Sequence, residues 1–104
     1  TKYRSKYYPK EESWIGEDAW AIEIPKSKID DPDTQYIDLK LQEDPGSERY
    51  YHLKVPTSFF KLHWDSFYFR ADRNNISLFL SAVPVTIFMD KRGSGRINFK
   101  EFLQ

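Results

Sequence analysis

Two alternating segments of the sequence, residues 35–42 and 49–55, flank a turn-forming stretch, Asp-Pro-Gly-Ser-Glu at 44–48. One antiparallel register makes one face wholly apolar, through the pairs Leu41–Tyr51, Leu39–Leu53 and Ile37–Val55. In the same register the polar residues fall on the opposite face, with Asp38 facing Lys54 and Lys40 facing His52. Because side chains alternate along a strand, a slip of one residue would mix the two faces. The pattern therefore predicts a hairpin in this register, and it constrains the fold more than any other feature of the chain.

Further segments have the alternation or the composition of strands. Residues 20–24 alternate and end at Pro25, which predicts a strand. Residues 66–71 and 76–82 flank Asp-Arg-Asn-Asn and predict a second hairpin, with the pairs Ala71–Ile76, Phe69–Leu78 and Phe67–Leu80. Residues 85–89 and 96–100 flank a glycine-containing loop and predict a third hairpin, with the pairs Ile87–Phe99 and Met89–Ile97.

A short helix is expected at residues 56–64, where proline is followed by Thr and Ser and then by apolar residues. Residues 26–34 contain Pro32 and three aspartates, which predicts a loop. A helical turn at residues 99–103 competes with the last strand. The expected fold class is β-rich α+β: a meander of about seven short antiparallel strands with one short helix, which can curl into a partly open barrel.

The first fourteen residues mix charge with tyrosine and have no clear period. We therefore expect residues 1–14 to form an N-terminal arm that docks through Tyr7, Tyr8 or Trp14. Residues 15–104 are expected to form a single β-rich domain, because a chain of 104 residues has room for one core of ordinary size.

The composition excludes several kinds of site. The chain has no cysteine, which excludes disulfides, thiolate zinc sites and cysteine nucleophiles. Its two histidines, His52 and His63, are too few for a histidine-rich metal site. The uncharged runs are too short or too interrupted to cross a membrane, and no signal peptide is visible. The resulting expectation is a cytoplasmic protein with no cofactor and no membrane partner.

The net charge of zero hides an uneven distribution of charge along the sequence. Residues 1–10 carry four basic residues and no acidic one, and residues 11–48 carry twelve acidic and three basic residues. Residues 49–104 carry nine basic and four acidic residues. The C-terminal half is therefore basic and aromatic, and a polyanionic partner remains compatible with the neutral total.

The predicted second and third hairpins place aromatic and basic side chains on one face of the sheet. Aromatic rings can stack on bases, and cations can contact phosphates, so this combination is typical of a nucleic-acid-binding surface. The residues expected on this surface or in the adjacent flexible loop are Tyr68, Arg70, Phe79, Phe88, Arg92, Arg96 and Lys100. The alternative is that a sheet covered on both sides buries the aromatic residues in the core.

Residues 90–101 resemble the calcium-binding loop of EF-hand proteins. Five residues match the pattern of that family: Asp90, Ser94, Gly95, Ile97 and Glu101. The resemblance implies a calcium site with ligands Asp90, Ser94 and Glu101. Two features depart from the family: Arg92 occupies a ligand position, and the β-branched segment at 84–89 replaces the entering helix. The alternative interpretation is a glycine-rich hairpin loop.

The sequence Asp38-Leu39-Lys40 is locally similar to PD-(D/E)xK nucleases, in which two carboxylates hold Mg²⁺ and a lysine assists the attacking water. This resemblance implies catalytic roles for Asp38 and Lys40, with Asp18 or Glu23 as the second carboxylate. The alternative is a solvated strand face with an Asp38–Lys54 cross-strand pair, which contributes about 0.2–1 kcal/mol.

Three hypotheses about function therefore stand. The first is a non-enzymatic binding module whose partner is a nucleic acid, another protein or a second copy of the chain. The second is a metal-dependent nuclease or a fragment of one. The third is a protein-interaction domain with a degenerate calcium loop. For the first hypothesis, the expected partner is a nucleic acid bound through the basic and aromatic C-terminal half, ahead of a protein partner.

Overall fold

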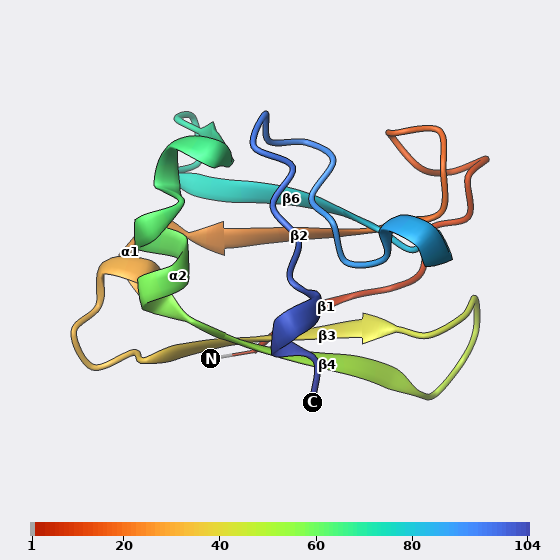
Figure 1. Ribbon diagram of the computed structural model, residues 1–104, viewed down its shortest axis with the longest axis horizontal. Coiled ribbons are helices and arrows are strands. Elements are labelled where there is room, and N and C mark those ends of the chain that lie inside the picture. Colours follow the sequence, from red (N-terminus) through yellow and green to blue (C-terminus); the bar gives the residue numbers. More distant parts are fainter. Residues whose placement is uncertain (1) are drawn as a thin grey trace.

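The computed structural model describes residues 2–104, whose strands form two three-stranded sheets stacked face to face (Figure 1). The strands are β1 (Lys2–Ser5), β2 (Ala19–Pro25), β3 (Tyr36–Gln42), β4 (Tyr50–Pro56), β5 (Tyr68–Arg70) and β6 (Asn75–Ser81). The helices are α1 (Lys26–Asp30) and α2 (Thr57–Leu62), with short 3-10 turns η1 (Trp64–Ser66), η2 (Pro84–Thr86) and η3 (Lys100–Phe102). One sheet has the order β1–β3–β4 and the other β2–β6–β5. The β-rich α+β class is confirmed, whereas seven strands in a partly open barrel are not found in these residues.

The β1–β3–β4 sheet contains the hairpin whose register the sequence defined. β3 and β4 pair in that register, with Leu41 opposite Tyr51 and Asp38 opposite Lys54. Residues 2–5 were expected to belong to an arm, but they form β1 and pair in parallel with β3. No local pattern indicates this pairing, because parallel pairing joins distant segments and β1 has no apolar alternation. The hydroxyl of Ser5 accepts a hydrogen bond from the Ala21 amide at 3.0 Å, which links β1 to the second sheet.

The second sheet has the expected strands but a different pairing of β5 with β6. Tyr68 pairs with Ser77, so the register differs by two residues from the expected one. The chain reverses one residue earlier than expected, and Asn74 adopts a left-handed conformation with φ of 55°. Asparagine tolerates this conformation, and Asn74 and Asn75 were equally good candidates for it. Because the difference is an even number of residues, Tyr68 and Phe79 still share the outer face.

Each helix begins directly after a proline that ends a strand. Pro25 and Pro56 both have φ of −61° and lead into α1 and α2, respectively. The helix expected at 56–64 is confirmed as α2, followed by η1. α1 lies in the segment that was expected to be a loop, where Ile29 supplies the buried contact of the helix. Both helices lie at one end of the two sheets (Figure 1).

The third expected hairpin does not form. Pro84–Thr86 is a 3-10 turn, and Phe88 has a positive φ of 66°, which breaks strand geometry. Met89 makes an isolated bridge with Asn98 rather than with Ile97. The C-terminal segment instead continues the sheet beside β6, where the Lys91 amide donates to the Phe79 carbonyl at 2.7 Å.

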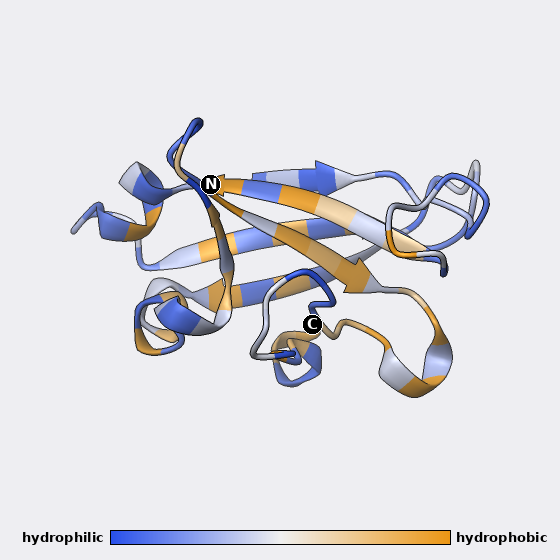
Figure 2. Cartoon of the chain, turned by 90° about the horizontal axis from the view of Figure 1, so that it is seen from above, coloured by the Kyte–Doolittle hydropathy of each residue, from blue (hydrophilic) through white to orange (hydrophobic). Residues whose placement is uncertain are grey.

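The core lies between the two sheets and is closed by the C-terminal segment. Hydrophobic residues alternate with hydrophilic ones along the strands (Figure 2), and the hydrophobic ones face this core. Trp20 stacks on Phe88 with ring centres 5.5 Å apart, and Phe67 stacks on Phe99 at 5.9 Å. The C-terminal segment finally reaches the other sheet, where Leu103 bridges to Leu53 of β4.

Candidate functional site

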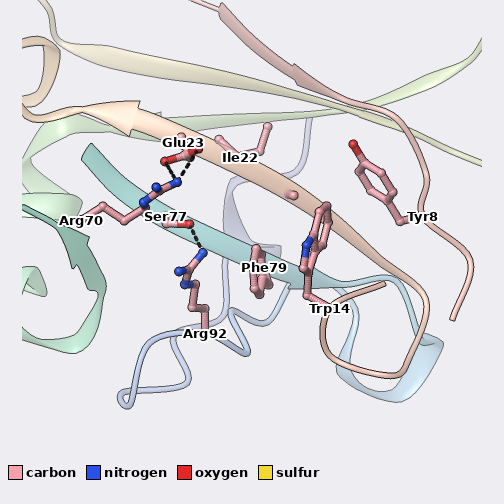
Figure 3. A pocket seen from close by; sticks show the side chains of 9 residues that line it. Tyr8, Trp14, Ile22, Glu23, Arg70, Ser77, Phe79 and Arg92 are labelled. Atoms are coloured by element: carbon pink, nitrogen blue, oxygen red, sulfur yellow. Dashed lines mark hydrogen bonds and ion pairs between the residues drawn. The ribbon is translucent and has the colours of Figure 1, made fainter. Parts of the chain in front are cut away.

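Four side chains form a continuous stack across the outer face of the β2–β6–β5 sheet. Three of them, Arg92, Phe79 and Trp14, are drawn in Figure 3. The guanidinium carbon of Arg92 lies 4.1 Å from the ring centre of Tyr68 and 4.6 Å from that of Phe79. The ring of Phe79 stacks on Trp14, with centres 5.2 Å apart and an interplanar angle of 12°. Tyr8 meets the far side of Trp14 edge-on at 4.9 Å. We refer to Tyr68, Arg92, Phe79 and Trp14 as the aromatic stack.

The register of β5 and β6 makes the slot that Arg92 occupies. Tyr68 is directly opposite Ser77, so Phe79 is its diagonal neighbour on the same face. Diagonal neighbours in a sheet lie about 7–8 Å apart, which leaves room for one planar group between two rings. Arg92 fills that space, and its Nη1 donates a hydrogen bond to the Ser77 hydroxyl at 2.7 Å.

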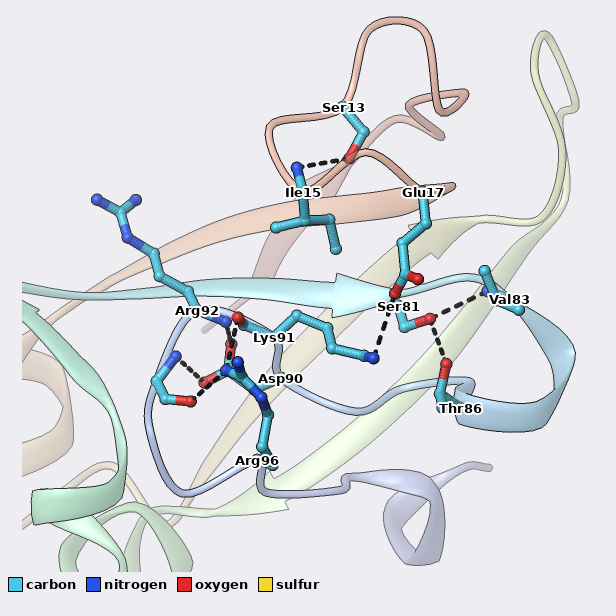
Figure 4. A network of polar contacts seen from close by, with 11 residues as sticks. Ser13, Ile15, Glu17, Ser81, Val83, Thr86, Asp90, Lys91, Arg92 and Arg96 are labelled. Atoms are coloured by element: carbon cyan, nitrogen blue, oxygen red, sulfur yellow. Dashed lines mark hydrogen bonds and ion pairs between the residues drawn. The ribbon is translucent and has the colours of Figure 1, made fainter.

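The buried carboxylate of Asp90 fixes the backbone that carries Arg92 (Figure 4). Its oxygens accept hydrogen bonds from the amides of Phe79, Arg92 and Gly93, each at 3.1 Å. Asp90 is fully buried, so water does not reach its side chain in the folded chain. The loop at 90–95, which we call the Asp90 loop, is therefore tied to β6 and turns back on itself.

Burial raises the pKa of the Asp90 carboxyl above its ordinary value. The three amide hydrogen bonds act in the opposite direction, because they favour the charged form, and the nearby charge of Arg96 does the same. Burial is the largest of these effects. Asp90 is thus a structural carboxylate that is held in place at an electrostatic cost.

Two glycines allow the Asp90 loop to pack directly against η1. A Cβ atom at Gly93 would collide with the carbonyl oxygen of Ser66 and would lie 2.9 Å from the Cα of Phe67. A Cβ atom at Gly95 would collide with the side chain of Ser66, and the Gly95 amide donates to the Ser66 carbonyl at 3.1 Å. The loop is a close-packed element of the fold, and this packing fixes the position of Arg92.

A hollow of about 660 Å³ lies on the sheet beside the aromatic stack. Ala21 and Ser77, both small, form part of its lining. Ser77 is labelled in Figure 3. Arg70 lies in its wall and bonds to Glu23 at 3.1 and 3.3 Å and to Asp72 at 3.2 Å. The volume is in the range of small-molecule binding sites. The hollow can accept a planar group against aromatic rings, with hydrogen-bonding groups at one side.

Four of the seven residues expected on a nucleic-acid-binding surface are brought together here: Tyr68, Arg70, Phe79 and Arg92. The other three do not join them. Phe88 is in the core and only 1% exposed. Arg96 uses its Nη1 to donate to the carbonyl oxygens of Lys91 and Gly93, and Lys100 lies in η3.

The sequence missed part of this site. Trp14 was one of three aromatic residues through which the N-terminal arm was expected to dock, and it stacks on Phe79; it was not expected at the binding surface, where it remains 61% exposed. Ser77 was not singled out, and Glu23 was named only as a possible second carboxylate of the nuclease hypothesis, although both lie on the outer face of their strands. The alternation along β2 and β6 could have indicated that they share a face with Phe79, whereas nothing in the sequence placed Trp14 there.

The residues of the nuclease hypothesis lie on separate surfaces. Asp38 and Lys40 are on the outer face of β3, where the Asp38 carboxylate bonds to Nε2 of His52 at 2.7 Å. Glu23 is on the outer face of the other sheet, beyond the core. Asp18 accepts bonds from the Tyr7 hydroxyl and the Lys10 amide. The structure therefore does not bring a second one of these carboxylates to Asp38.

The residues of the calcium hypothesis do not converge on one site either. The carboxylate of Asp90 accepts backbone amides, whereas Ser94 and Glu101 are exposed in the loop and in η3. Among residues 2–104, no group of three or more His, Asp or Glu side chains is arranged to hold a metal ion. Within the same residues, no helix has the length and apolar character needed to cross a membrane.

Comparison with protein-family models, with curated proteins and with solved structures finds no match for this chain.

Proposed function

We propose that this chain is a small non-enzymatic binding module that takes a single-stranded nucleic acid on the outer face of the β2–β6–β5 sheet. The observation that carries the proposal is the aromatic stack, which ends in Trp14 with 61% of its surface exposed. Trp14 is exposed beside the hollow, so a base can stack on the part of the indole that Phe79 and Tyr8 leave uncovered. Stacking of this kind contributes about 1–3 kcal/mol per base and tolerates any sequence.

The charge of Arg92 supports the same proposal. Arg92 forms no ion pair with a carboxylate of residues 2–104, and its guanidinium is held between two rings beside the hollow. A fixed cation next to a stacking surface can contact the phosphate of the stacked nucleotide. Arg70 adds hydrogen-bond donors at the hollow, although Glu23 and Asp72 offset its charge. The cytoplasmic location expected from the sequence stays a prediction.

The test measures the binding of a pool of single-stranded oligonucleotides at low salt, with fluorescence anisotropy as the readout. Replacing Trp14 by alanine should weaken binding by about 5- to 160-fold, which corresponds to the loss of one stacked base. Leu62→Ala is the matched control, because Leu62 is 78% exposed at the end of α2 and belongs neither to the aromatic stack nor to the lining of the hollow. It should leave the affinity unchanged. If the pool does not bind the unmodified chain, or if Trp14→Ala binds equally well, the proposal is wrong.

A further inference from the structure

The outer face of the β1–β3–β4 sheet carries a second group of basic and aromatic side chains. Outward-facing positions alternate along the three strands, and four of them hold a lysine or an arginine. We call these four the basic face: Lys2, Arg4, Lys40 and Lys54. Asp38 is the acidic residue among the outward positions of these strands. Its carboxylate bonds to His52 rather than to any of the four cations.

Pairing between the strands arranges these cations in two rows. Arg4 is beside Lys40, and Lys40 is opposite His52, so that one row of basic side chains crosses all three strands. Lys2 and Lys54 flank Asp38 in the neighbouring row. Neighbouring strands lie about 4.8 Å apart, and positions on one face of a strand lie about 6.7 Å apart. The cations are therefore spread over a flat surface.

Two tyrosines support the outer cations of this face. The guanidinium carbon of Arg4 lies 5.9 Å from the ring centre of Tyr50, and Nζ of Lys54 lies 4.6 Å from that of Tyr36. Both rings are exposed, at 40% and 43%, respectively. A cation over an aromatic ring is restrained without being neutralised. None of the four cations forms an ion pair within residues 2–104.

We propose that the basic face binds the phosphate backbone of a single-stranded nucleic acid, as a second surface on the side of the molecule opposite the aromatic stack. The proposal rests on the proposed function for the identity of the polymer, but the basic face itself does not depend on it. Restrained, unpaired cations on a flat sheet suit a chain of regularly spaced anions. The exposed tyrosines add ring surfaces beside them.

Nucleic acid is favoured over a second copy of the chain because of where the acidic residues lie. Glu43, Asp44 and Glu48 are in and beside the β3–β4 turn, and Asp31 and Asp33 follow α1. They lie in turns and loops rather than on a sheet face that could cover the basic one, and Asp33 lines a small hollow together with Lys54 of the basic face itself. The carboxylate of Asp31 is also engaged by the Asp33 amide at 2.9 Å.

The experiment measures how the affinity for a single-stranded oligonucleotide depends on salt. Each phosphate contact contributes about −0.7 to the slope of log K against log salt, so four contacts contribute about −2.8. The double substitution Lys40→Gln and Lys54→Gln should make the slope shallower by about 1.4. Lys28→Gln with Lys61→Gln is the matched control, because both lysines are exposed on the short helices and the change in charge is equal. The control should keep the original slope, and a slope equally unchanged in the Lys40 and Lys54 variant would overturn the proposal.

A second arm with inorganic polyphosphate separates this surface from the stacking site, because polyphosphate has no bases. Polyphosphate should shift the backbone amide resonances of Lys40 and Lys54 and leave the indole resonance of Trp14 in place. That result, together with no effect of any oligonucleotide on Trp14, would retain the basic face and reject the proposed stacking function. If polyphosphate shifts no resonance of β1, β3 or β4, the inference is wrong even when Trp14 responds to oligonucleotides. A dimer that dissociates only when Lys40 and Lys54 are replaced would show a second copy on this face and would also overturn it.

Discussion

Replacing Asp90 with alanine should lower the free energy of unfolding by about 3 kcal/mol. The substitution leaves three amide donors without acceptors, those of Phe79, Arg92 and Gly93, each now bonded at 3.1 Å. A buried donor that loses its partner costs about 1–3 kcal/mol. We use the lower end of that range, because the amides of Phe79 and Arg92 are only partly buried and because the burial cost of the carboxylate disappears with it.

Urea unfolding followed by tryptophan fluorescence measures this loss. With an m-value of about 1.5 kcal/mol/M, the midpoint should fall by about 2 M. The Arg92 side-chain resonances, which ring currents displace in the intact stack, should move toward their free positions because the loop no longer fixes Arg92. Ser94→Ala is the control, since Ser94 is exposed in the same loop. A loss below about 1 kcal/mol, with Arg92 still stacked, would refute the role assigned to Asp90.

Three other changes test the packing and the titrating groups. Gly93→Ala should destabilise the chain by about 1–3 kcal/mol in the same urea assay, because the new methyl group meets the Ser66 carbonyl, and a stability equal to that of Ser94→Ala would contradict this close approach. Burial and the hydrogen bond to Asp18 at 2.6 Å raise the pKa of Tyr7, so its contribution to stability is complete below its ordinary pKa of 10.0 and is lost at higher pH. On titration above pH 10, Tyr7→Phe should therefore lose less stability than the unmodified chain. Parallel stability curves would show that Tyr7 does not titrate in this way. The raised pKa of Asp90 means that this group, too, contributes stability at low pH that is lost as the pH rises. Relative to Asp90→Asn, the unmodified chain should be most stable below the ordinary carboxyl pKa of 3.8 and should lose that advantage as the pH rises through the raised value. A difference in stability that grows with pH would mean that the folded-state pKa is lowered instead.

The first hairpin could be predicted in detail because two independent signals agree there. The Pro-Gly turn limits the loop, and only one register puts Leu39 and Leu53 on the same apolar face. The register of β5 with β6 could not be decided in the same way, since a shift of two residues keeps every side chain on its face. The two asparagines at 74 and 75 left the position of the turn open.

The C-terminal segment was harder to predict because its apolar residues, such as Phe88 and Phe99, pack into the core from loops and turns instead of from a strand. Residues 85–89 have the β-branched composition of a strand, but Phe88 is buried beside Trp20 and adopts a positive φ. β1 was missed for a different reason, as its partner β3 is more than thirty residues away in the sequence.

The candidate site could be predicted in part from alternation along single strands. Tyr68, Arg70 and Phe79 belong to one hairpin, so their shared face followed from the sequence. Trp14 and Arg92 arrive from loops whose paths depend on tertiary contacts, such as those of Asp90 with the amides around it. Local patterns contain no information on such contacts, although Arg92 had been chosen for its charge.

The most direct test of the proposed function is a ¹H–¹⁵N map of the chain during titration with a single-stranded oligonucleotide at low salt. We expect shifts at the Trp14 indole, at the Phe79 and Arg92 amides, and at the Ser77 amide between them, whereas the buried Trp20 indole should not move. Binding that leaves these resonances in place, or no binding at all, would contradict the claim that the aromatic stack takes nucleic acid.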